Sequence, residues 1–402
     1  MAKHDVLVIG GGISGLTFAW ESARAGRDTL VVEREERVGG AVCSRRAPAG
    51  YWYELGAHTC YNSYAGLAEV VEACGIRGEV IARTKTHLRL MEGDRVLPGS
   101  NMGALLRRLD LFEAARSFPR IFSAKKDGET VYSYYSRIVG RRNYGKVLGP
   151  MFSAVPSQNA DAFPADMLFK SRKTRRKDFP RSFTLNGGLQ ALCEAVARQP
   201  KVTVVAGRAA TRLERDGNGF AVTLDGGERH EAPVVAIAVP PSAAAALLQG
   251  VAPELGRQVA RVKEAVVESL GLVVEAAKVT RIPTSMFLVP SDDVFHSIVT
   301  RDSVPDARYR AFVFHFKPGR SRDEKLARAA AFLGLGQGEL ADLSERRTVL
   351  PSPVLGHEEI VREIDRLSAG SRLCVTGNYF AGLSLEDCVA RSREEWARVA
   401  AA

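Results

Sequence analysis

The segment Val6-Leu-Val-Ile-Gly10-Gly-Gly12-Ile-Ser-Gly15-Leu, close to the start of the chain, carries the strongest structural signal in the sequence. It places glycines at G-x-G-x-x-G spacing directly after an apolar run that predicts a β-strand. Gly10 allows a sharp turn, Gly12 allows the backbone to approach a pyrophosphate, and Gly15 allows the next helix to lie close to the sheet. The segment therefore predicts a dinucleotide-binding unit, with a helix N-terminus facing the phosphates.

The residues that follow supply the context that this motif needs. An amphipathic helix is predicted from Leu16 to Ala25, and a second strand, Thr29 to Val32, ends at Glu33. A carboxylate there can accept hydrogen bonds from a ribose 2′-OH and should repel a 2′-phosphate. The alternative is a glycine-rich turn without a ligand. It does not explain why strand, glycine turn, helix, second strand and acidic residue follow one another in this order. Because the first strand begins at about Asp5, we expect neither a signal peptide nor a membrane span here.

Two further segments identify the dinucleotide. Glu33 is followed by Arg34-Glu-Glu-Arg-Val-Gly39-Gly40, and later by Tyr53-Glu-Leu-Gly56-Ala57-His58. This order resembles the flavin amine oxidase and protoporphyrinogen oxidase superfamily, in which the glycine pair lets the backbone pass against the pyrophosphate and ribityl chain of FAD. The family usually has Arg directly after the glycine pair, whereas this chain has Ala41. The resemblance implies that the cofactor is FAD.

Two later blocks extend the resemblance over most of the chain. Gly187-Gly-Leu-Gln190, followed by a helix and a strand that leads to Ala210, resembles the segment that covers the adenine side of FAD. The stretch Leu373–Cys388 resembles the closing segment of the porphyrinogen oxidases, where a helix N-terminus faces the flavin. Some amine oxidases attach FAD to a C-terminal Cys, but Cys388 fits the non-covalent pattern better. The resemblance thus implies non-covalent FAD.

The resemblance assigns FAD contacts residue by residue. The implied cofactor-binding residues are Gly10, Gly12, Ile13, Ser14, Gly15, Glu33, Arg34, Gly39, Gly40, Gly56, Ala57, His58, Ala210, Gly377, Asn378, Leu383, Ser384 and Leu385.

Chain length and the resemblance together predict two intertwined domains. A chain of 402 residues is too long for a single core. The expected fold class is α/β (α+β overall), with a Rossmann-like FAD-binding domain of the glutathione-reductase type and a substrate domain that has an antiparallel sheet and a helical lobe. We expect the FAD-binding domain at residues 1–83, 184–262 and 349–402, the substrate domain at 84–102 and 263–348, and its helical lobe at 103–183.

Periodicity in the middle of the chain predicts the elements of the substrate domain. Residues 84–98 alternate around a Glu-Gly-Asp turn and predict a hairpin over the substrate site. Helices are predicted at 104–118, 132–139 and 144–152, and antiparallel strands that roof the flavin at 266–274, 285–289, 297–300 and 311–316. Two more helices are expected at 324–332 and 339–343.

The formal net charge is +10, and the cations are clustered. The densest run, residues 170–181, contains Lys170, Arg172, Lys173, Arg175, Arg176, Lys177 and Arg181. Three interpretations are open: a solvated loop, peripheral contact with anionic lipid headgroups, and steering of an anionic substrate. Nucleic acid is not expected as a partner, because no recognition module accompanies the charge. We expect a cytoplasmic protein, with peripheral contact at the inner membrane surface as the alternative.

Composition and cysteine spacing place few further limits on function. The hydrophobic fraction of 46% and the charged fraction of 25% are those of an ordinary soluble globular protein. The six cysteines show neither a C-x-x-C pair nor Cys/His ligand spacing. We therefore expect reduced, buried thiols and no metal site.

The resemblance also suggests catalytic residues. Amine oxidases of the superfamily often carry a Lys near flavin N5, on a strand that corresponds to Ala265–Leu272, and this stretch contains no Lys. Its absence favours the porphyrinogen oxidases or desaturases. His58 is the candidate acid/base or substrate ligand, with a structural role as the alternative. For His296 and His315, we favour structure over function.

A substrate-binding residue is implied on the predicted hairpin. Porphyrinogen oxidases hold a substrate carboxylate there through an Arg, and that position falls at His87, with Lys85 or Arg89 as alternatives. The sequence thus predicts an FAD-dependent oxidase or dehydrogenase that takes a hydride from a bulky reduced organic substrate onto flavin N5, with O₂ or a quinone as electron acceptor. A protoporphyrinogen-oxidase-like enzyme is the leading hypothesis. The alternatives are a flavin amine oxidase or polyene desaturase, a non-redox flavin mutase of a nucleotide sugar, and a flavin-free binding protein of the GDI type.

Overall fold

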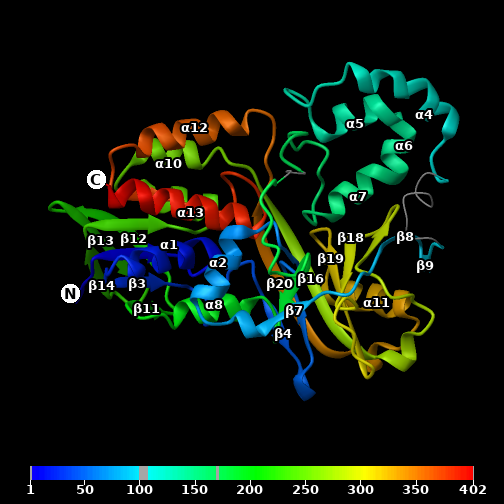
Figure 1. The fold of residues 1–402 in the computed structure, drawn as a ribbon, viewed down its shortest axis with the longest axis horizontal. Helices are drawn as coiled ribbons and strands as arrows, with labels where there is room; N and C mark the ends of the chain where they lie inside the picture. Colours follow the sequence, from blue (N-terminus) through cyan, green and yellow to red (C-terminus); the bar gives the residue numbers. More distant parts are fainter. Residues whose placement is uncertain (1, 99–106, 169–171, 402) are drawn as a thin grey trace.

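The computed structural model describes residues 2–98, 107–168 and 172–401. Figure 1 shows one part that contains both termini, a second part built around a sheet, and a group of helices beside that sheet. The long strands β16 (Glu264–Glu275) and β20 (Ala341–Pro351) lie side by side in the middle of the molecule, where the two parts meet. In the described ranges, no helix combines the length and apolar character needed to cross a membrane.

A five-stranded parallel sheet lies at the centre of the part that contains the termini, in the order β11-β3-β2-β15-β21. Short apolar runs form these strands because both faces of the sheet are covered. The strands are β2 (Val6–Ile9), β3 (Thr29–Val32), β11 (Val202–Val205), β15 (Val234–Ile237) and β21 (Leu373–Val375).

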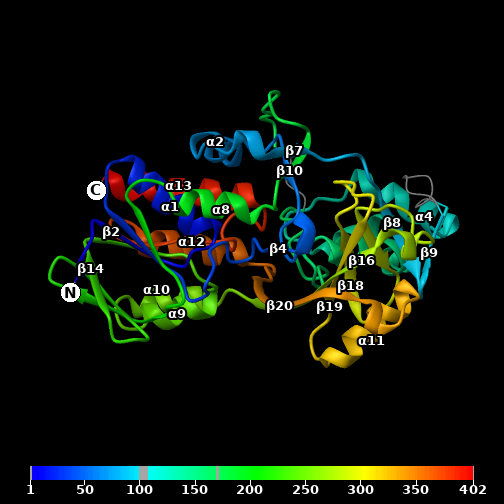
Figure 2. The same cartoon turned by 90° about the horizontal axis from the view of Figure 1, so that it is seen from below.

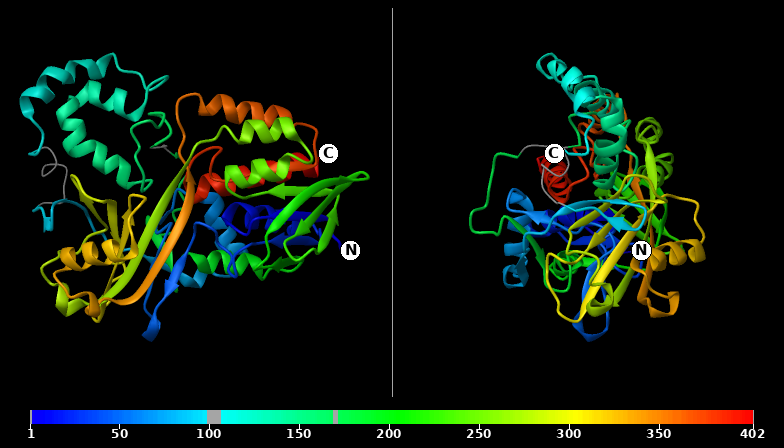
Figure 3. Two further views of the ribbon diagram at one scale, coloured as in Figure 1. Left: turned by 180° about the vertical axis from the view of Figure 1, so that it is seen from behind. Right: turned by 90° about the vertical axis from the view of Figure 1, so that its right-hand side faces the viewer.

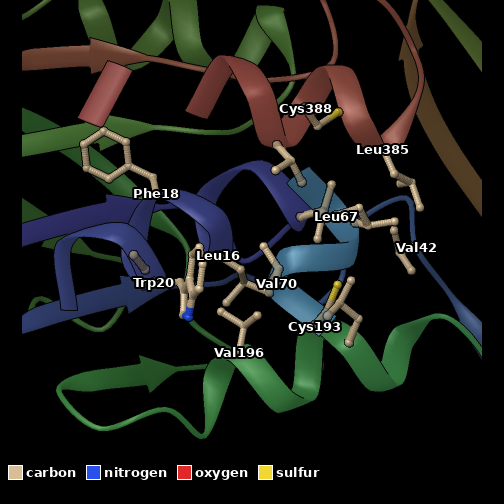
Figure 4. Close-up of a cluster of buried hydrophobic side chains, with 14 of the residues drawn as sticks. Leu16, Phe18, Trp20, Val42, Leu67, Val70, Cys193, Val196, Leu385 and Cys388 are labelled. Carbon is tan, nitrogen blue, oxygen red and sulfur yellow. The ribbon is translucent and has the colours of Figure 1, made fainter. Parts of the chain in front are cut away.

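Helices cover one face of this parallel sheet. They are α1 (Ile13–Arg24), α2 (Ala65–Ala73), α8 (Gln190–Ala197) and α13 (Leu385–Ala400). Figure 4 shows Leu16 of α1 close to Val70 of α2 and Val196 of α8, in a core that also contains Cys388 of α13. Phe18 completes this core by packing edge-on against Trp396, with 5.6 Å between ring centroids.

The opposite face is covered by a smaller sheet and three more helices. The sheet has the order β1-β14-β13-β12, and Figure 2 shows α9 and α10 on the side away from α2. The strands are β1 (Ala2–Lys3), β12 (Ala210–Asp216), β13 (Gly219–Leu224) and β14 (Arg229–Ala232), and the helices are α9 (Pro241–Leu248), α10 (Pro253–Val259) and α12 (His357–Ser368).

A seven-stranded sheet forms the second part, in the order β20-β16-β19-β18-β17-β8-β9. Its other strands are β8 (Leu88–Glu92), β9 (Arg95–Val96), β17 (Phe287–Pro290), β18 (Phe295–Thr300) and β19 (Tyr309–Phe316). The predicted hairpin and strands are confirmed, but β17 and β8 pair in parallel, so the sheet is mixed. Helix α11 (Arg322–Leu333) packs on one face through an aromatic core.

A lobe of short helices lies on the other side of this sheet (Figures 1 and 3). It packs on the sheet through Val147 and Ala154, which contact Leu90 and Val289 in one apolar cluster. Its helices are α4 (Leu111–Ser117), η3 (Phe118–Phe122), α5 (Val131–Val139), α6 (Arg141–Asn143), the π-helical η4 (Tyr144–Leu148) and α7 (Gly149–Ala154).

Two helix predictions need correction. The helix predicted at 104–118 begins at Leu111, because the Asp110 side chain accepts a hydrogen bond from the N–H of Glu113 and caps it there; residues 104–106 lie outside the described residues. The helix predicted at 339–343 is wrong, because residues 341–351 form β20, whose backbone pairs with β16 along most of its length.

Small sheets and turns connect the two parts. They are β4 (Ser44–Arg46) with β5 (Trp52–Glu54), β10 (Ser182–Leu185) between β6 (Cys60–Tyr61) and β7 (Val80–Ala82), and the single turns η1 (Pro48–Gly50), η2 (Arg77–Glu79), η5 (Ala276–Val279) and η6 (Gln337–Glu339).

Candidate active site

The predicted glycine turn lies between β2 and α1. Gly10 has a φ of +107°, which L-residues with side chains rarely adopt. A Cβ on Gly15 would lie 2.0 Å from the carbonyl oxygen of Gly10, so the helix can approach the strand this closely because the residue is glycine. A Cβ on Gly12 would meet one atom within 4 Å, the Cα of Gly40 at 3.9 Å. Space is therefore open beside Gly12, where a ligand backbone could pass.

The N-terminus of α1 faces this open space without a protein cap. Gly12 is the N-cap residue, no side chain caps the helix, and its first turn contains no acidic residue. The sheet strands β2, β15 and β21 end at the same edge, which is where dinucleotides bind in open α/β sheets. Free N–H groups and the helix dipole suit a pyrophosphate at this position.

Glu33 lies at the end of β3 and is 8% exposed. Its carboxylate accepts hydrogen bonds from the N–H of Gly11 at 2.7 Å and from the N–H of Glu35 at 2.9 Å. These bonds fix the side chain at the strand end, and each carboxylate oxygen can still accept further bonds. The backbone N–H of Arg208 donates to the carbonyl of Glu33, which brings the start of β12 and its Ala210 close by.

The second glycine pair lies directly beside the first motif. The N–H of Gly39 donates to the carbonyl of Gly11 at 2.8 Å. Gly40 is held from two sides, because both the Arg37 and the Arg346 guanidinium donate to its carbonyl, at 2.9 and 2.8 Å. Arg346 belongs to β20, so the seven-stranded sheet is tied to the glycine motif. Arg34, which directly follows Glu33 in the chain, is exposed.

The C-terminal block meets the same edge of the parallel sheet. Gly377 and Asn378 follow β21, and the Ser384 hydroxyl caps α13 by accepting a bond from the N–H of Asp387 at 3.1 Å. Leu383 precedes this cap and Leu385 begins the helix, and their contacts with FAD stay a prediction.

The basic run contacts this block. Arg172 donates to the Ser384 hydroxyl at 2.7 Å and to the Asp387 carboxylate at 2.6 Å, and Arg176 pairs with Glu72 at 2.7 Å. Lys170 lies outside the described residues. The ion pairs neutralise part of the run, but Lys173, Arg175 and Lys177 are exposed in irregular chain, so the solvated-loop, lipid-contact and substrate-steering interpretations all stay predictions.

Gly56, Ala57 and His58 form a tight turn after β5. A Cβ on Gly56 would lie 2.0 Å from the carbonyl oxygen of Ala41, so no side chain fits there. The ring of His58 packs edge-on against Phe287 of β17, with 4.9 Å between centroids, and its Nδ1 lies 3.2 Å from the carbonyl oxygen of Gly56. Burial and the nearby Arg83 lower the pKa of His58 to about 4. His58 is therefore neutral at pH 7.

A second histidine lies close to His58 on the seven-stranded sheet. His315 of β19 pairs in register with Ser269 of β16, and its Nδ1 lies 2.9 Å from the Ser269 hydroxyl oxygen. Burial, followed by the interaction with His58, lowers the pKa of His315 to about 3. Sequence reasoning favoured a structural role for His315. That role stays a prediction; alternation along β19 places His315 on the face opposite Phe314 and the α11 core.

The predicted substrate ligands on the hairpin do not meet His58. Alternation along β8 places His87 and Arg89 on the face opposite Leu88, which pairs in register with Phe287 beside His58. Arg89 instead donates to the carbonyl of Thr284 at 3.4 Å. Lys85 is exposed before the strand begins. Their role in substrate binding stays a prediction.

Sequence reasoning missed Arg83, which the structure places beside His58. Its Nε donates to the Ser303 hydroxyl at 2.7 Å, and its Nη1 donates to the hydroxyl of Thr59. Arg83, His58 and Arg301 line one small cavity. No local pattern marks Arg83, because the cavity is assembled from segments far apart in the chain.

Glu54 of β5 gives a prediction for stability. Its buried carboxyl accepts bonds from the N–H of Leu189 at 2.7 Å and the Ser44 hydroxyl at 2.6 Å, yet burial raises the pKa of Glu54 to about 7. The folded protein therefore holds a proton that the unfolded chain releases near pH 4.3, and stability should fall as the pH rises from about 4.3 to 7.

We expect Glu54→Gln to remove this pH dependence, which amounts to about 4 kcal/mol across the window. The measurement is the free energy of unfolding from urea titrations at half-unit pH steps. Glu92→Gln, which alters an exposed carboxylate paired with Arg108, is the control and should keep the wild-type slope. Equal slopes in wild type and Glu54→Gln would contradict the argument.

Three features define the class of protein: the glycine turn after β2, the uncapped N-terminus of α1 and the fixed carboxylate of Glu33. Together they are typical of a protein that binds a dinucleotide along the carboxyl edge of a parallel sheet. The sequence pattern of one family, flavin containing amine oxidoreductase, matches residues 13–274. The chain belongs to this family. It is a flavin-containing oxidoreductase whose cofactor is FAD, which confirms the predictions of superfamily, enzyme class and cofactor.

Three similar proteins illustrate the relationship. The chain is 24% identical to coproporphyrinogen III oxidase of Bacillus subtilis (strain 168) over 292 residues, which cover 61% of this chain and 62% of that protein. The match thus spans less than two thirds of the relative's length. Two solved structures share the fold: a protein from Exiguobacterium sp. 255-15 described as a protoporphyrinogen oxidase (TM-score 0.78, 17% identity, 98% of each chain), and reduced UDP-galactopyranose mutase (TM-score 0.78, 14% identity, 99% of this chain and 96% of that one). These matches confirm a mixed α/β fold with several sheets.

Proposed function

We propose that this enzyme oxidises a porphyrinogen, in the manner of a protoporphyrinogen-type oxidase. The observation that carries the proposal is the charge around His58, where the neighbouring charged group is Arg83 and a second guanidinium, Arg301, lines the same cavity. Cations repel an ammonium group and attract carboxylates, so this environment favours an anionic substrate over an amine. The similarity to coproporphyrinogen III oxidase supports the same substrate class.

The described residues fit FAD. The open space at Gly12 and the free N-terminus of α1 suit the pyrophosphate, and Glu33 suits the ribose. The N-terminus of α13, which the resemblance assigns to the flavin ring, is capped by Ser384 and carries Glu386 and Asp387 in its first turn. When bound, FAD supplies the two-electron chemistry by accepting a hydride. We propose non-covalent binding, because Cys388 is 3% exposed and burial raises the pKa of its thiol to about 12, which leaves it unreactive.

The finer fold assignment belongs to the same proposal. We propose a Rossmann-like FAD-binding domain of the glutathione-reductase type and a separate substrate domain, with the boundaries predicted from the sequence. The separate cores of the parallel sheet and of the seven-stranded sheet support this division. In the proposed substrate domain, β20 extends to Pro351.

The protein contributes a neutral, water-poor surface beside the flavin. His58 and His315 are both neutral at pH 7 and can each accept a proton. We propose that His58 accepts a proton that the substrate releases when its hydride leaves, and that the Ser269 hydroxyl holds the ring of His315 in place. O₂ or a quinone would then re-oxidise the enzyme.

The test is anaerobic stopped-flow absorbance of the purified FAD protein with protoporphyrinogen IX, and with coproporphyrinogen III in parallel. Bleaching of the oxidised-flavin band without oxygen, and its return when oxygen is admitted, is expected. Putrescine is the amine control and should leave the flavin oxidised. An oxidised flavin with both porphyrinogens overturns the proposal. Bleaching by the amine would then indicate an amine oxidase, and turnover of UDP-galactopyranose only with pre-reduced flavin would indicate a mutase.

A further inference from the structure

The cavity beside His58 contains an excess of positive charge. Trp52, His58, Arg83, Thr300, Arg301 and Ser303 are among its lining residues. Its volume of about 20 Å³ is enough for about one water-sized polar group. A guanidinium that loses water without gaining a counter-charge is costly, so an unbalanced pair of arginines needs a physical explanation.

Arg83 has hydroxyl partners and no carboxylate partner among the described residues. It donates to Ser303 and Thr59, both of which are neutral. Burial lowers the pKa of Arg83, which reflects the unfavourable surroundings of its charge. Its two hydroxyl partners orient the guanidinium without neutralising it.

Arg301 is also without a carboxylate partner in the described part of the chain. Its Nε and Nη1 are buried and have no hydrogen-bond partner, and its guanidinium lies over the rings of Tyr51 and Trp52, at 4.4 and 4.5 Å from their centroids. The adjacent carboxylate, Asp302, does not compensate it. Asp302 instead forms a buried pair with Arg310, at 3.0 and 2.6 Å.

Glu54, which also lines the cavity, interacts with the charge of Arg83 but forms no ion pair with either arginine in the described part of the chain. Its oxygens accept bonds from the Leu189 N–H and the Ser44 hydroxyl, and its pKa of about 7 leaves it largely protonated in mildly acidic solution. Among the described lining residues Glu54 is the only carboxylate, so the cavity holds two positive charges and at most one negative charge, which is only partly ionised near pH 7.

We propose that this cavity binds a carboxylate group, held by Arg83 and Arg301 beside His58. A carboxylate matches a guanidinium in shape, because its two oxygens can accept two parallel N–H bonds, and the cavity is too small for a bulkier anion. The carboxylate belongs either to the reduced substrate or to a free small acid. The assignment of the carboxylate to the substrate rests on the proposed function. The binding of a carboxylate at this cavity is independent of that function.

Acetate tests the site without any turnover. We expect sodium acetate, at constant ionic strength, to raise the melting temperature of the FAD-loaded enzyme and to perturb its flavin spectrum, while the neutral isostere acetamide does neither. In Arg83→Gln and in Arg301→Gln, the acetate dissociation constant should rise at least tenfold. Without acetate, both variants should be at least as stable as wild type, because each removes an uncompensated charge. A merely structural arginine would instead destabilise the protein when replaced.

Arg308→Gln is the matched control, because Arg308 lies in the following loop and pairs with Asp306 at the surface. It should bind acetate like wild type. No acetate effect on wild type, or an equal effect in wild type, Arg83→Gln and Arg301→Gln, overturns the proposal. If acetate raises the KM for porphyrinogen and leaves kcat unchanged, the carboxylate is the substrate's; an unchanged KM assigns the site to a free acid. A failure of porphyrinogen to reduce the flavin leaves the acetate result intact.

Discussion

Gly12→Val is expected to give a folded protein that purifies without flavin. The Cβ of a new side chain at position 12 would make an ordinary contact with Gly40 and would otherwise enter the open space beside the N-terminus of α1. The residue has an extended backbone, with φ −72° and ψ 174°, that valine adopts easily. The substitution therefore fills the site proposed for the pyrophosphate while leaving the protein packing intact.

The expected loss of FAD affinity is at least about 100-fold, or about 2.7 kcal/mol. The measurements are the flavin-to-protein absorbance ratio after purification and a fluorescence titration of the apoprotein with FAD. Far-UV circular dichroism should match that of wild-type apoprotein. A stoichiometric yellow protein would show that Gly12 does not face the cofactor.

Gly15→Val is the matched control within the same motif, and it should fail for a different reason. Its Cβ would lie 2.0 Å from the carbonyl oxygen of Gly10 and 3.0 Å from a methyl group of Val8. Something must move between β2 and α1, and we expect insoluble or unfolded protein. A folded Gly15→Val variant would contradict the close approach of this helix and strand.

Elements that local geometry determines could be predicted from the sequence, whereas elements that depend on distant partners could not. The glycine motif, β2, α1 and β3 follow each other in the chain, and each residue type is required by local geometry, so the sequence was sufficient. The prediction for residues 339–343 was wrong because β20 depends on partners far away. Its pairing with β16, and the bonds from Arg45 and Tyr53 to Asp342, determine this strand, and no periodicity within it reports them.

In the candidate site, too, residues in contiguous motifs could be predicted and residues brought together by the fold could not. Contiguous motifs predicted residues at the strand ends, such as Glu33 and Gly40. Arg83 and Arg301 could not be predicted, because what marks them is that neither forms an ion pair with a carboxylate among the described residues. That absence becomes visible only when three-dimensional contacts show that Asp302 is already paired with Arg310.

That pairing leads to the second large effect: Arg310→Met should lower the free energy of unfolding by about 3–5 kcal/mol. The Arg310 side chain is 10% exposed, and its guanidinium donates to both carboxylate oxygens of Asp302 and to the carbonyls of Val279 and Ile282. Asp302 in turn accepts from the N–H of Ser285. Removing the arginine leaves a 4% exposed carboxylate without its counter-charge, which is the most expensive outcome for a buried pair.

A double-mutant cycle separates the charge from the packing. Asp302→Leu/Arg310→Met removes both charges, so its cost should fall to about 1–3 kcal/mol, which reflects the carbonyls and the Ser285 N–H that lose partners. The pair of the exposed Arg308 with the partly buried Asp306 is the control, and Arg308→Met should cost less than about 1 kcal/mol. Urea titrations at pH 7 of wild type, Arg310→Met, Asp302→Leu, the double variant and Arg308→Met supply the values. If the single and double variants are equally destabilised, the cost lies in the lost carbonyl bonds and not in an unpaired Asp302. In that case Asp302 would also be free to balance Arg301, so this cycle tests the charge argument for the cavity beside His58 as well.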